Sequence, residues 1–424
     1  MLRIRHSTIA KLVLSFSLAL LVSHQAAAVG FIVNPTSENT GIANAGTAVY
    51  DRSVAAVHNN PAAMALMPYK QVGGNLSVAI PDWSVDEDWD CREENNCADS
   101  NIGKIATIPG LGLIRPMDYG FTWGIGVAAI AGQGVDYGDK WKGRAIVRDN
   151  SVSVLGLMNS LAWRMNEKWT FGVGLGIIYG DFYQKQDLPS LSASAGDDIE
   201  SVIDFVGLAQ DCQGLPPPLL AVCLRNAVGD SGLDPESAAE TIGSITSYLG
   251  GERGTHVKLE GDDLSAEITL GATYEFIPGH RLGVVYRHTS NFSFKGDASI
   301  NGQLLSDEEK QSPHMTLSWN MPDRLIVSGS HRATDNWRLF WDFERTYFNT
   351  FKRTDLRMDG YPTVRIDRNF NDANRYAIGS EYAFNEKWTL QLGASFDESP
   401  VDDEDRMPDI PVDEITKFMT GAIY

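Results

Sequence analysis

One short stretch of the chain combines aromatic and basic residues in a way that could bind a ligand. The segment "YFNTFKRTDLR" places Phe348 and Phe351 just before Lys352 and Arg353. An apolar wall beside a cation suits an amphipathic acid, because an unpaired carboxylate is costly to bury in an apolar pocket. We therefore expect these four residues to contact the ligand. The alternative is that Lys352 and Arg353 are ordinary charges at a solvated rim.

Catalytic and metal-binding patterns are weak. In "SGSHR", Ser330 is next to His331, but neighbours on a strand point to opposite faces and cannot form a nucleophile and base pair. The glycines of "GVGLG" are not followed by a helix, as a nucleotide-binding loop would require. The acidic loops do not fit the calcium loop of an EF-hand. We therefore expect no enzyme activity, no cofactor and no metal.

The first residues indicate export. Three basic residues precede an apolar run over residues 12–22, and "HQAAAVG" supplies small residues for cleavage between Ala28 and Val29. We interpret residues 1–28 as a signal peptide, because the apolar run is shorter than the roughly 20 residues that span a bilayer.

In an exported chain, cysteine pairs that are close in sequence suggest disulfides. The pairs are Cys91–Cys97 and Cys212–Cys223. Zinc is the competing interpretation, but the spacings are not those of zinc sites and no His lies near either pair.

The pentapeptide "NEKWT" occurs twice and is followed each time by alternation of residue types. From Trp169 to Tyr179 every second residue is apolar, and the residues between are mostly glycine. Period two predicts strands joined by tight hairpins. The face of these strands opposite the apolar residues is too polar to pack in a second hydrophobic core, and aromatic residues stand near the strand ends. This pattern is typical of a transmembrane β-barrel with apolar side chains facing lipid. A soluble all-β fold is the alternative.

The charge is strongly acidic and unevenly distributed. The chain has 35 Lys and Arg against 55 Asp and Glu, with a net charge of −20. This disfavours nucleic acid and anionic lipid as partners. Acidic residues gather in segments 82–99, 187–252 and 397–414, at the strand ends opposite the "NEKWT" turns. Short turns at one end and long loops at the other are typical of the periplasmic and extracellular faces of an outer-membrane barrel.

Residues 29–70 precede the first clear strand and are rich in Ala, Asn, Gly and Ser. Helices are predicted over residues 43–50 and 54–58, with Pro61 ending the second. The segment is too polar for lipid, so we expect a compact insert that plugs the lumen of a barrel formed by residues 71–424. Asn60 and Pro61 should fix this hatch against the wall.

The sequence resembles the outer-membrane long-chain fatty-acid transporters (the FadL family), which include relatives for toluene-like aromatic hydrocarbons. The resemblance rests on Gly30-Phe31, on the "NPA" of Asn60, Pro61 and Ala62, and on two long segments. These segments are "MPDRLIVSGSHRATDNWRLFWDFERTYFNTF" from Met321 and "YAIGSEYAFNEKWTLQLGASFDESPVDDEDRMPDIPVDE" from Tyr376. The resemblance implies an antiparallel fourteen-stranded transmembrane barrel with a small N-terminal α-helical hatch. It also implies that a hydrophobic ligand enters through the extracellular loops and leaves sideways into the membrane.

Two features of the chain depart from this family pattern. Family members carry basic residues soon after the Tyr of the segment matching "IIYGDFYQKQD", whereas here Asp181 comes first and Lys185 later. We count about twelve strands, and the family continues through a further hairpin beyond the position of Tyr424. We therefore expect a missing C-terminal hairpin.

These patterns predict passive outer-membrane transport of long-chain fatty acids or other hydrophobic compounds. The protein should be a monomer surrounded by outer-membrane lipid and lipopolysaccharide. The alternatives are a general porin or structural barrel and an aromatic-hydrocarbon channel. A porin needs no plug, whereas residues 29–70 have the composition of one. The apolar patch "GLPPPLLAVCL" over residues 214–224 could capture a ligand, or it could pack on a neighbouring loop.

Overall fold

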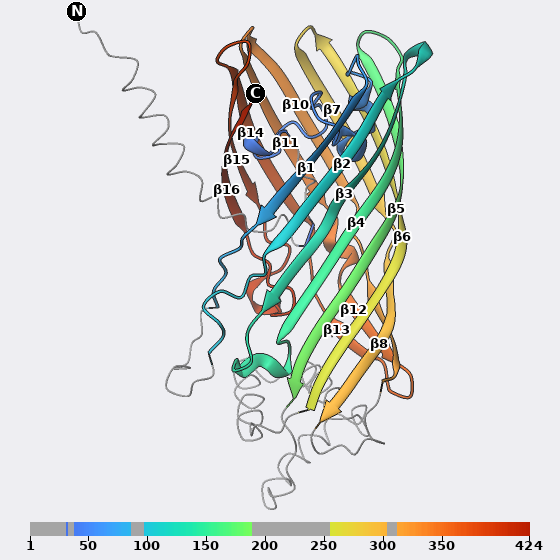
Figure 1. Ribbon diagram of the computed structural model, residues 1–424, viewed down its shortest axis with the longest axis vertical. Helices are drawn as coiled ribbons and strands as arrows, with labels where there is room; N and C mark the ends of the chain where they lie inside the picture. The colour runs from blue at the N-terminus through green and yellow to red at the C-terminus, as the bar shows by residue number, and fades with distance from the viewer. Residues whose placement is uncertain (1–30, 33–37, 86–96, 189–254, 303–311) are drawn as a thin grey trace, which may run out of the picture.

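The computed structural model describes residues 31–32, 38–85, 97–188, 255–302 and 312–424. One antiparallel sheet curls into a barrel-shaped wall, and the N-terminal segment lies within it near the end that carries the short turns (Figure 1). No helix in these described ranges is long and apolar enough to cross a membrane.

The described strands range from 4 to 23 residues in length. The first half of the sheet comprises β1 Gln71–Ala79, β2 Ala106–Pro116, β3 Phe121–Asp136, β4 Asp149–Arg164, β5 Trp169–Leu188, β6 Thr255–Ile277, β7 His280–Thr289 and β8 Phe292–Gly302. The second half comprises β9 His314–Trp319, β10 Arg324–Thr334, β11 Trp337–Thr346, β12 Arg353–Met358, β13 Val364–Asp367, β14 Ala373–Ala383, β15 Thr389–Asp397 and β16 Ile415–Ile423. The short helices are η1 Thr40–Ile42, α2 Ala56–Asn59, α3 Pro61–Met64, η2 Asp118–Gly120, η3 Lys142–Ala145, η5 Phe348–Thr350 and η6 Asp403–Asp405.

Four wall strands are interrupted: the breaks lie between β7 and β8, β9 and β10, β11 and β12, and β13 and β14. The main path runs β1-β2-β3-β4-β5-β6-β7-β10-β11-β14-β15-β16, and β8, β9, β12 and β13 continue the pairing beyond the interruptions. If each interrupted strand is counted once, the described wall has the roughly twelve strands expected from the sequence. β1 and β16 are the two ends of this path, and no pairing joins them in the part of the chain that the structure describes.

The two faces of the wall confirm the predicted alternation. On β5, Leu175 and Ile177 are each 60% exposed on the outer face, whereas Thr170 and Ile178 are buried on the inner face. Leu392 on β15 is likewise 66% exposed. Large apolar side chains standing outward at this exposure would be unfavourable in water, so this surface faces lipid.

The repeated pentapeptide forms the same turn at both places. In the first copy, Asn166 Oδ1 accepts hydrogen bonds from the backbone N–H groups of Lys168 and Trp169, both at 2.9 Å. In the second, Asn385 Oδ1 accepts from Lys387 and Trp388 at 2.8 and 3.0 Å. An Asn side chain that bonds the backbone two residues ahead substitutes for a backbone turn. The repeat therefore encodes two equivalent hairpin connections.

The N-terminal segment is less helical than predicted. The helix expected over residues 43–50 is wrong: these residues form turns, and Ala43 and Asn44 have left-handed backbone angles with φ of 54°. The prediction over residues 54–58 coincides in part with α2. That helix ends before Pro61, as predicted, and Pro61 then begins α3, whose first residue has no need of a backbone N–H.

Candidate functional site

An apolar slot lies inside the wall, in the half away from the short turns. Its lining comes from β5, β6, β8, β9, β12 and β13, and includes Val257, Leu259, Ile300, Leu317, Leu356 and Val364. Three polar side chains, Gln184, Gln186 and Arg368, also line it. The slot has a volume of about 30 Å³, which is room for about two water molecules. A ligand would therefore have to widen it.

A cluster of aromatic rings continues the apolar interior. Phe31 packs against Trp319, Phe348 and Phe351, with ring centroids 5.1, 5.6 and 5.2 Å apart. Phe370 packs against Phe351 at 5.1 Å. These edge-to-face arrangements are among the favoured ones for aromatic pairs. The slot and these rings belong to one buried apolar cluster, so the interior is continuously apolar from the slot to Phe31.

The four residues predicted to contact the ligand separate into two groups. Phe348 and Phe351 are fully buried in the aromatic cluster. Lys352 and Arg353 are exposed instead: Lys352 Nζ donates to Asn371 Oδ1 at 2.9 Å, and Arg353 pairs with Asp355. The structure thus brings the two aromatic residues to the apolar interior without the two adjacent cations.

The cation that faces the ring of Phe351 is Arg368, with its guanidinium carbon 6.0 Å from the ring centroid. Arg368 was not among the residues predicted from the sequence. The sequence could have indicated Arg368 by its position after Val364 and Ile366, because residues at period two share one face of a strand.

A second cavity of about 510 Å³ lies between the N-terminal segment and the wall. Its lining joins apolar residues of β1, β2 and β4 to three cations, Lys104, Arg375 and Lys417. Each cation has a carboxylate partner. Lys104 pairs with Asp149, while Lys417 and Arg375 both contact Asp397, at 2.6 and 3.2 Å. The cavity is therefore amphipathic and locally charge-compensated.

The hatch segment, defined here as residues 38–70, is held by side chains of the wall that bond its backbone. Asp342 accepts the N–H groups of Gly46 and Thr47 at 2.9 and 3.1 Å, and Ser328 Oγ accepts that of Ala48 at 2.8 Å. Further wall side chains donate to hatch carbonyls: Arg375 to Ala43, Ser160 to Val57, Arg287 to His58 and Thr170 to Ala62. A buried segment with little regular structure needs such partners for its backbone.

Asn60, Pro61 and Ala62 lie at the centre of this contact. The buried Asn60 side chain donates to the carbonyl of Ala48 and accepts the N–H of Ala62 at 3.0 Å. Two glycines of the facing wall allow the approach. A methyl group added at Gly172 would overlap the backbone at Pro61 and Ala62, and one added at Gly271 would overlap Asn60 Oδ1.

An ionic group ties the same segment to the wall near the short turns. Asp51 pairs with Arg281 at 3.0 Å and with Arg338 at 3.2 Å. Burial alone would raise the pKa of Asp51, but the two guanidinium groups hold it below its ordinary value. Tyr50 donates to Glu381 at 2.7 Å, and burial together with that carboxylate raises the pKa of Tyr50. Both hatch groups therefore stay in the protonation state that these contacts require at neutral pH.

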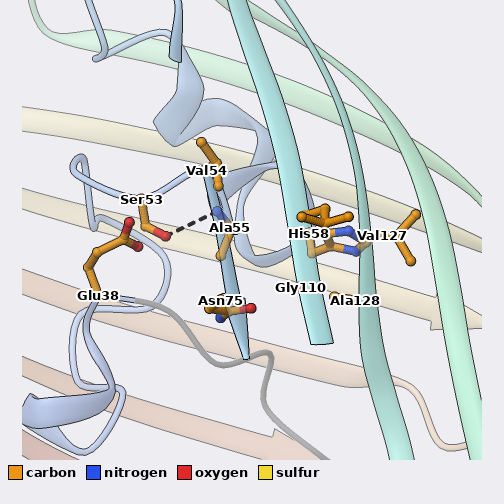
Figure 2. Close-up of a pocket in the computed structure, with 11 residues that line it drawn as sticks. Glu38, Ser53, Val54, Ala55, His58, Asn75, Gly110, Val127 and Ala128 are labelled. Carbon is orange, nitrogen blue, oxygen red and sulfur yellow. Dashed lines mark hydrogen bonds between the residues drawn. The ribbon is translucent and has the colours of Figure 1, made fainter. Parts of the chain in front are cut away.

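His58, in α2 of the hatch segment, faces strands β1, β2 and β3 beside a small pocket of about 20 Å³ (Figure 2). Its side chain is 2% exposed and lies against the backbone of Gly126 on β3. Burial, reinforced by the positive charge of Arg287, lowers the pKa of His58 to about 3. The imidazole is therefore neutral throughout the physiological range.

Some predicted features lie outside the described residues. Cys97 is disulfide-bonded, but Cys91, Cys212 and Cys223 fall in segments that the structure does not describe. The two disulfide pairings therefore stay predictions. The apolar patch over residues 214–224 also lies outside the described residues. Within the described ranges, no group of three or more His, Cys, Asp or Glu side chains could hold a metal ion.

An antiparallel wall with an apolar outer face, an amphipathic interior and a packed N-terminal segment defines an outer-membrane β-barrel protein. The chain belongs to the family described as outer membrane protein transport protein (OMPP1/FadL/TodX), whose model matches residues 19–424. This membership confirms the resemblance and the outer-membrane location. It places the chain among transport proteins for hydrophobic compounds.

Individual relatives are distant in sequence but match most of the chain. The long-chain fatty acid transport protein of Escherichia coli (strain K12) is 23% identical over 417 residues, which cover 95% of this chain and 86% of the relative. A solved Pseudomonas aeruginosa FadL homologue has a TM-score of 0.69 at 17% identity, covering 93% of this chain and 87% of its own. The P. putida toluene transporter TodX has a TM-score of 0.58 at 16% identity, covering 93% and 88%. These structures show a shared fold.

Proposed function

We propose that this protein carries long-chain fatty acids or similar hydrophobic molecules across the outer membrane by passive diffusion, with the hatch segment closing the lumen. The observation that carries this proposal is the continuous apolar interior formed by the slot and the aromatic cluster. An aqueous porin would instead need a water-filled lumen lined by charges. The names of relatives add support, because one group is named for long-chain fatty acids and another for toluene.

The proposed inner stage of the route is the 510 Å³ cavity beside the hatch segment. The apolar part of its lining suits a long hydrocarbon tail, whereas its three cations already have carboxylate partners. We propose that the ligand passes from the slot along the aromatic cluster to this cavity, and leaves sideways into the membrane as the family resemblance implies. Passage past Phe31 requires the rings to separate, since they are packed at van der Waals contact.

Aromatic hydrocarbons are the second candidate class of substrate. The observation that favours them is that Lys352 and Arg353 do not face the apolar interior but bond Asn371 and Asp355. An interior without those two cations would still bind an uncharged ring through the aromatic cluster.

Uptake in cells distinguishes these possibilities. The full-length protein is expressed in a bacterial strain that lacks its own transporter, and uptake of labelled oleate and toluene is measured against an empty vector. We expect oleate uptake to rise well above the vector control. Uptake of toluene alone would assign the protein to hydrocarbons, and uptake of neither would contradict the proposed function.

The hatch is tested separately by deletion of residues 29–70. The strands pair with one another rather than through the hatch, so we expect the barrel to fold, to conduct ions in a planar bilayer and to lose selective uptake. A folded deletion variant that stays closed to ions would show that this segment does not close the lumen.

A further inference from the structure

Arg368 is a buried cation at the edge of the apolar slot. It follows β13 directly, and its side chain is 3% exposed. Its guanidinium donates through Nε to Thr354 Oγ1 at 3.1 Å and through Nη1 to Asp409 at 2.7 Å. The sulfur of Met407 lies 3.6 Å from the same Nη1. Apart from Gln184 and Gln186, the rest of the slot lining is apolar.

Asp409 comes from a different part of the chain, the connection between β15 and β16. It is 4% exposed, and its backbone carbonyl accepts a hydrogen bond from Gln133 Nε2 at 2.7 Å. Its neighbour Pro408 offers its carbonyl to the hydroxyl of Tyr137 at 2.8 Å. These bonds anchor the connection at the end of β3, so the carboxylate of Asp409 reaches Arg368 from a loop that does not line the slot.

The pair of Arg368 and Asp409 stabilises the protein when the slot is empty. A guanidinium buried among aliphatic side chains and left without a counter-charge costs about 3–5 kcal/mol. Asp409 removes that cost when no ligand is present. A ligand with a carboxylate head and an apolar tail could make the same charge-assisted hydrogen bond while its tail fills the slot.

We propose that Asp409 occupies the place of the ligand carboxylate in the empty protein, and that Arg368 selects acids over uncharged hydrophobic molecules. This inference rests on the proposed function, because it assigns the acidic head group to one residue of the proposed slot. When the ligand carboxylate displaces Asp409 from Arg368, the connection around Met407 and Pro408 loses its bond to the slot.

The exposed cation Arg353 provides a matched control. Arg353 carries the same guanidinium group and begins β12, a strand that lines the slot. It is exposed, however, and pairs with Asp355. Replacing Arg353 should therefore leave ligand selection unchanged, whereas replacing Arg368 should alter it.

The test compares an acid with its uncharged ester. Binding of oleate and methyl oleate to the purified protein in detergent is measured for the wild type and for Arg368→Gln, Arg368→Lys, Asp409→Asn and Arg353→Gln. A heat-modifiability gel verifies that each variant is folded. Arg368→Gln should weaken oleate binding about 10- to 100-fold and leave methyl oleate unchanged. Asp409→Asn should tighten oleate binding, because it removes the competing carboxylate. Arg368→Lys should fall between the wild type and Arg368→Gln.

Three results would overturn the inference. Oleate binding could be insensitive to Arg368→Gln, or acid and ester could weaken equally, as a purely structural role would require. Asp409→Asn could also weaken oleate binding, which would make Asp409 part of the ligand site and not its competitor. A wild-type protein that binds neither molecule would instead contradict the proposed function itself, and the assay separates that outcome from the first three.

Discussion

The attachment of the hatch can be weakened at one wall residue without disturbing the sheet. Asp342 accepts hydrogen bonds from Gly46 and Thr47 and lies 3.8 Å from Arg375. Asp342→Ala leaves two buried N–H groups without acceptors, at about 1–3 kcal/mol each. Arg375 keeps Asp397 as a partner at 3.2 Å, so its additional loss is small. We expect a total loss of about 3 kcal/mol in the attachment of the hatch, which corresponds to a roughly 100-fold larger detached fraction.

This loss should be local because the strand ladders around Asp342 stay intact. Hydrogen exchange of residues 42–49 should accelerate, and openings in planar-bilayer recordings should become about 100-fold more frequent. Asp323→Ala is the control, since Asp323 bonds His288 at 2.7 Å outside the hatch contact. Equal exchange and conductance in the wild type and Asp342→Ala would refute the claim that this carboxylate holds the hatch.

Three further predictions follow from the hatch and the turns. The pKa of His58 is about 3 in the attached hatch and about 6.5 when the hatch is detached, so the detached state binds the proton first as the pH falls. Attachment of the hatch should therefore be constant above pH 6.5 and weaken by about 2 kcal/mol at pH 5. This loss should appear as faster hydrogen exchange and be absent in a His58→Phe variant. Gly172→Ala should displace the hatch and raise ion conductance in a bilayer, whereas Gly132→Ala, where the nearest atoms are 3.3 Å or more from the added carbon, should not. Asn166→Ala and Asn385→Ala should each lower barrel stability by about 1 kcal/mol, measured as similar decreases in Tm in detergent; a large decrease at one position only would show that the two turns are not equivalent.

Local sequence patterns predicted the wall well because they depend on neighbouring residues. The alternation after Trp169 assigns Leu175 to lipid and Thr170 to the lumen, and the structure places them there. The same reasoning accounts for the paired turns at Asn166 and Asn385. Period two and turn chemistry are properties of a few consecutive residues, so a single sequence is sufficient to detect them.

Features that depend on distant contacts were missed. The pair of Arg368 and Asp409 joins residues 41 positions apart, and nothing in the local sequence separates Arg368 from exposed arginines such as Arg353. The helix expected over residues 43–50 was wrong because the wall supplies partners to backbone groups there, as Asp342 does, and so permits left-handed turns at Ala43 and Asn44. The hatch therefore adopts a conformation that its own residues do not specify.

The central claim is that a hydrophobic ligand occupies the lumen slot. It is tested most directly by a fatty acid that carries a photoactivatable diazirine near the end of its tail, crosslinked to the protein in outer-membrane vesicles and located by mass spectrometry. We predict labelling of the slot residues Leu317, Leu356 and Val364, suppressed by excess oleate. Labelling confined to lipid-facing residues such as Ile378 and Leu392, and unaffected by oleate, would contradict a binding site inside the barrel.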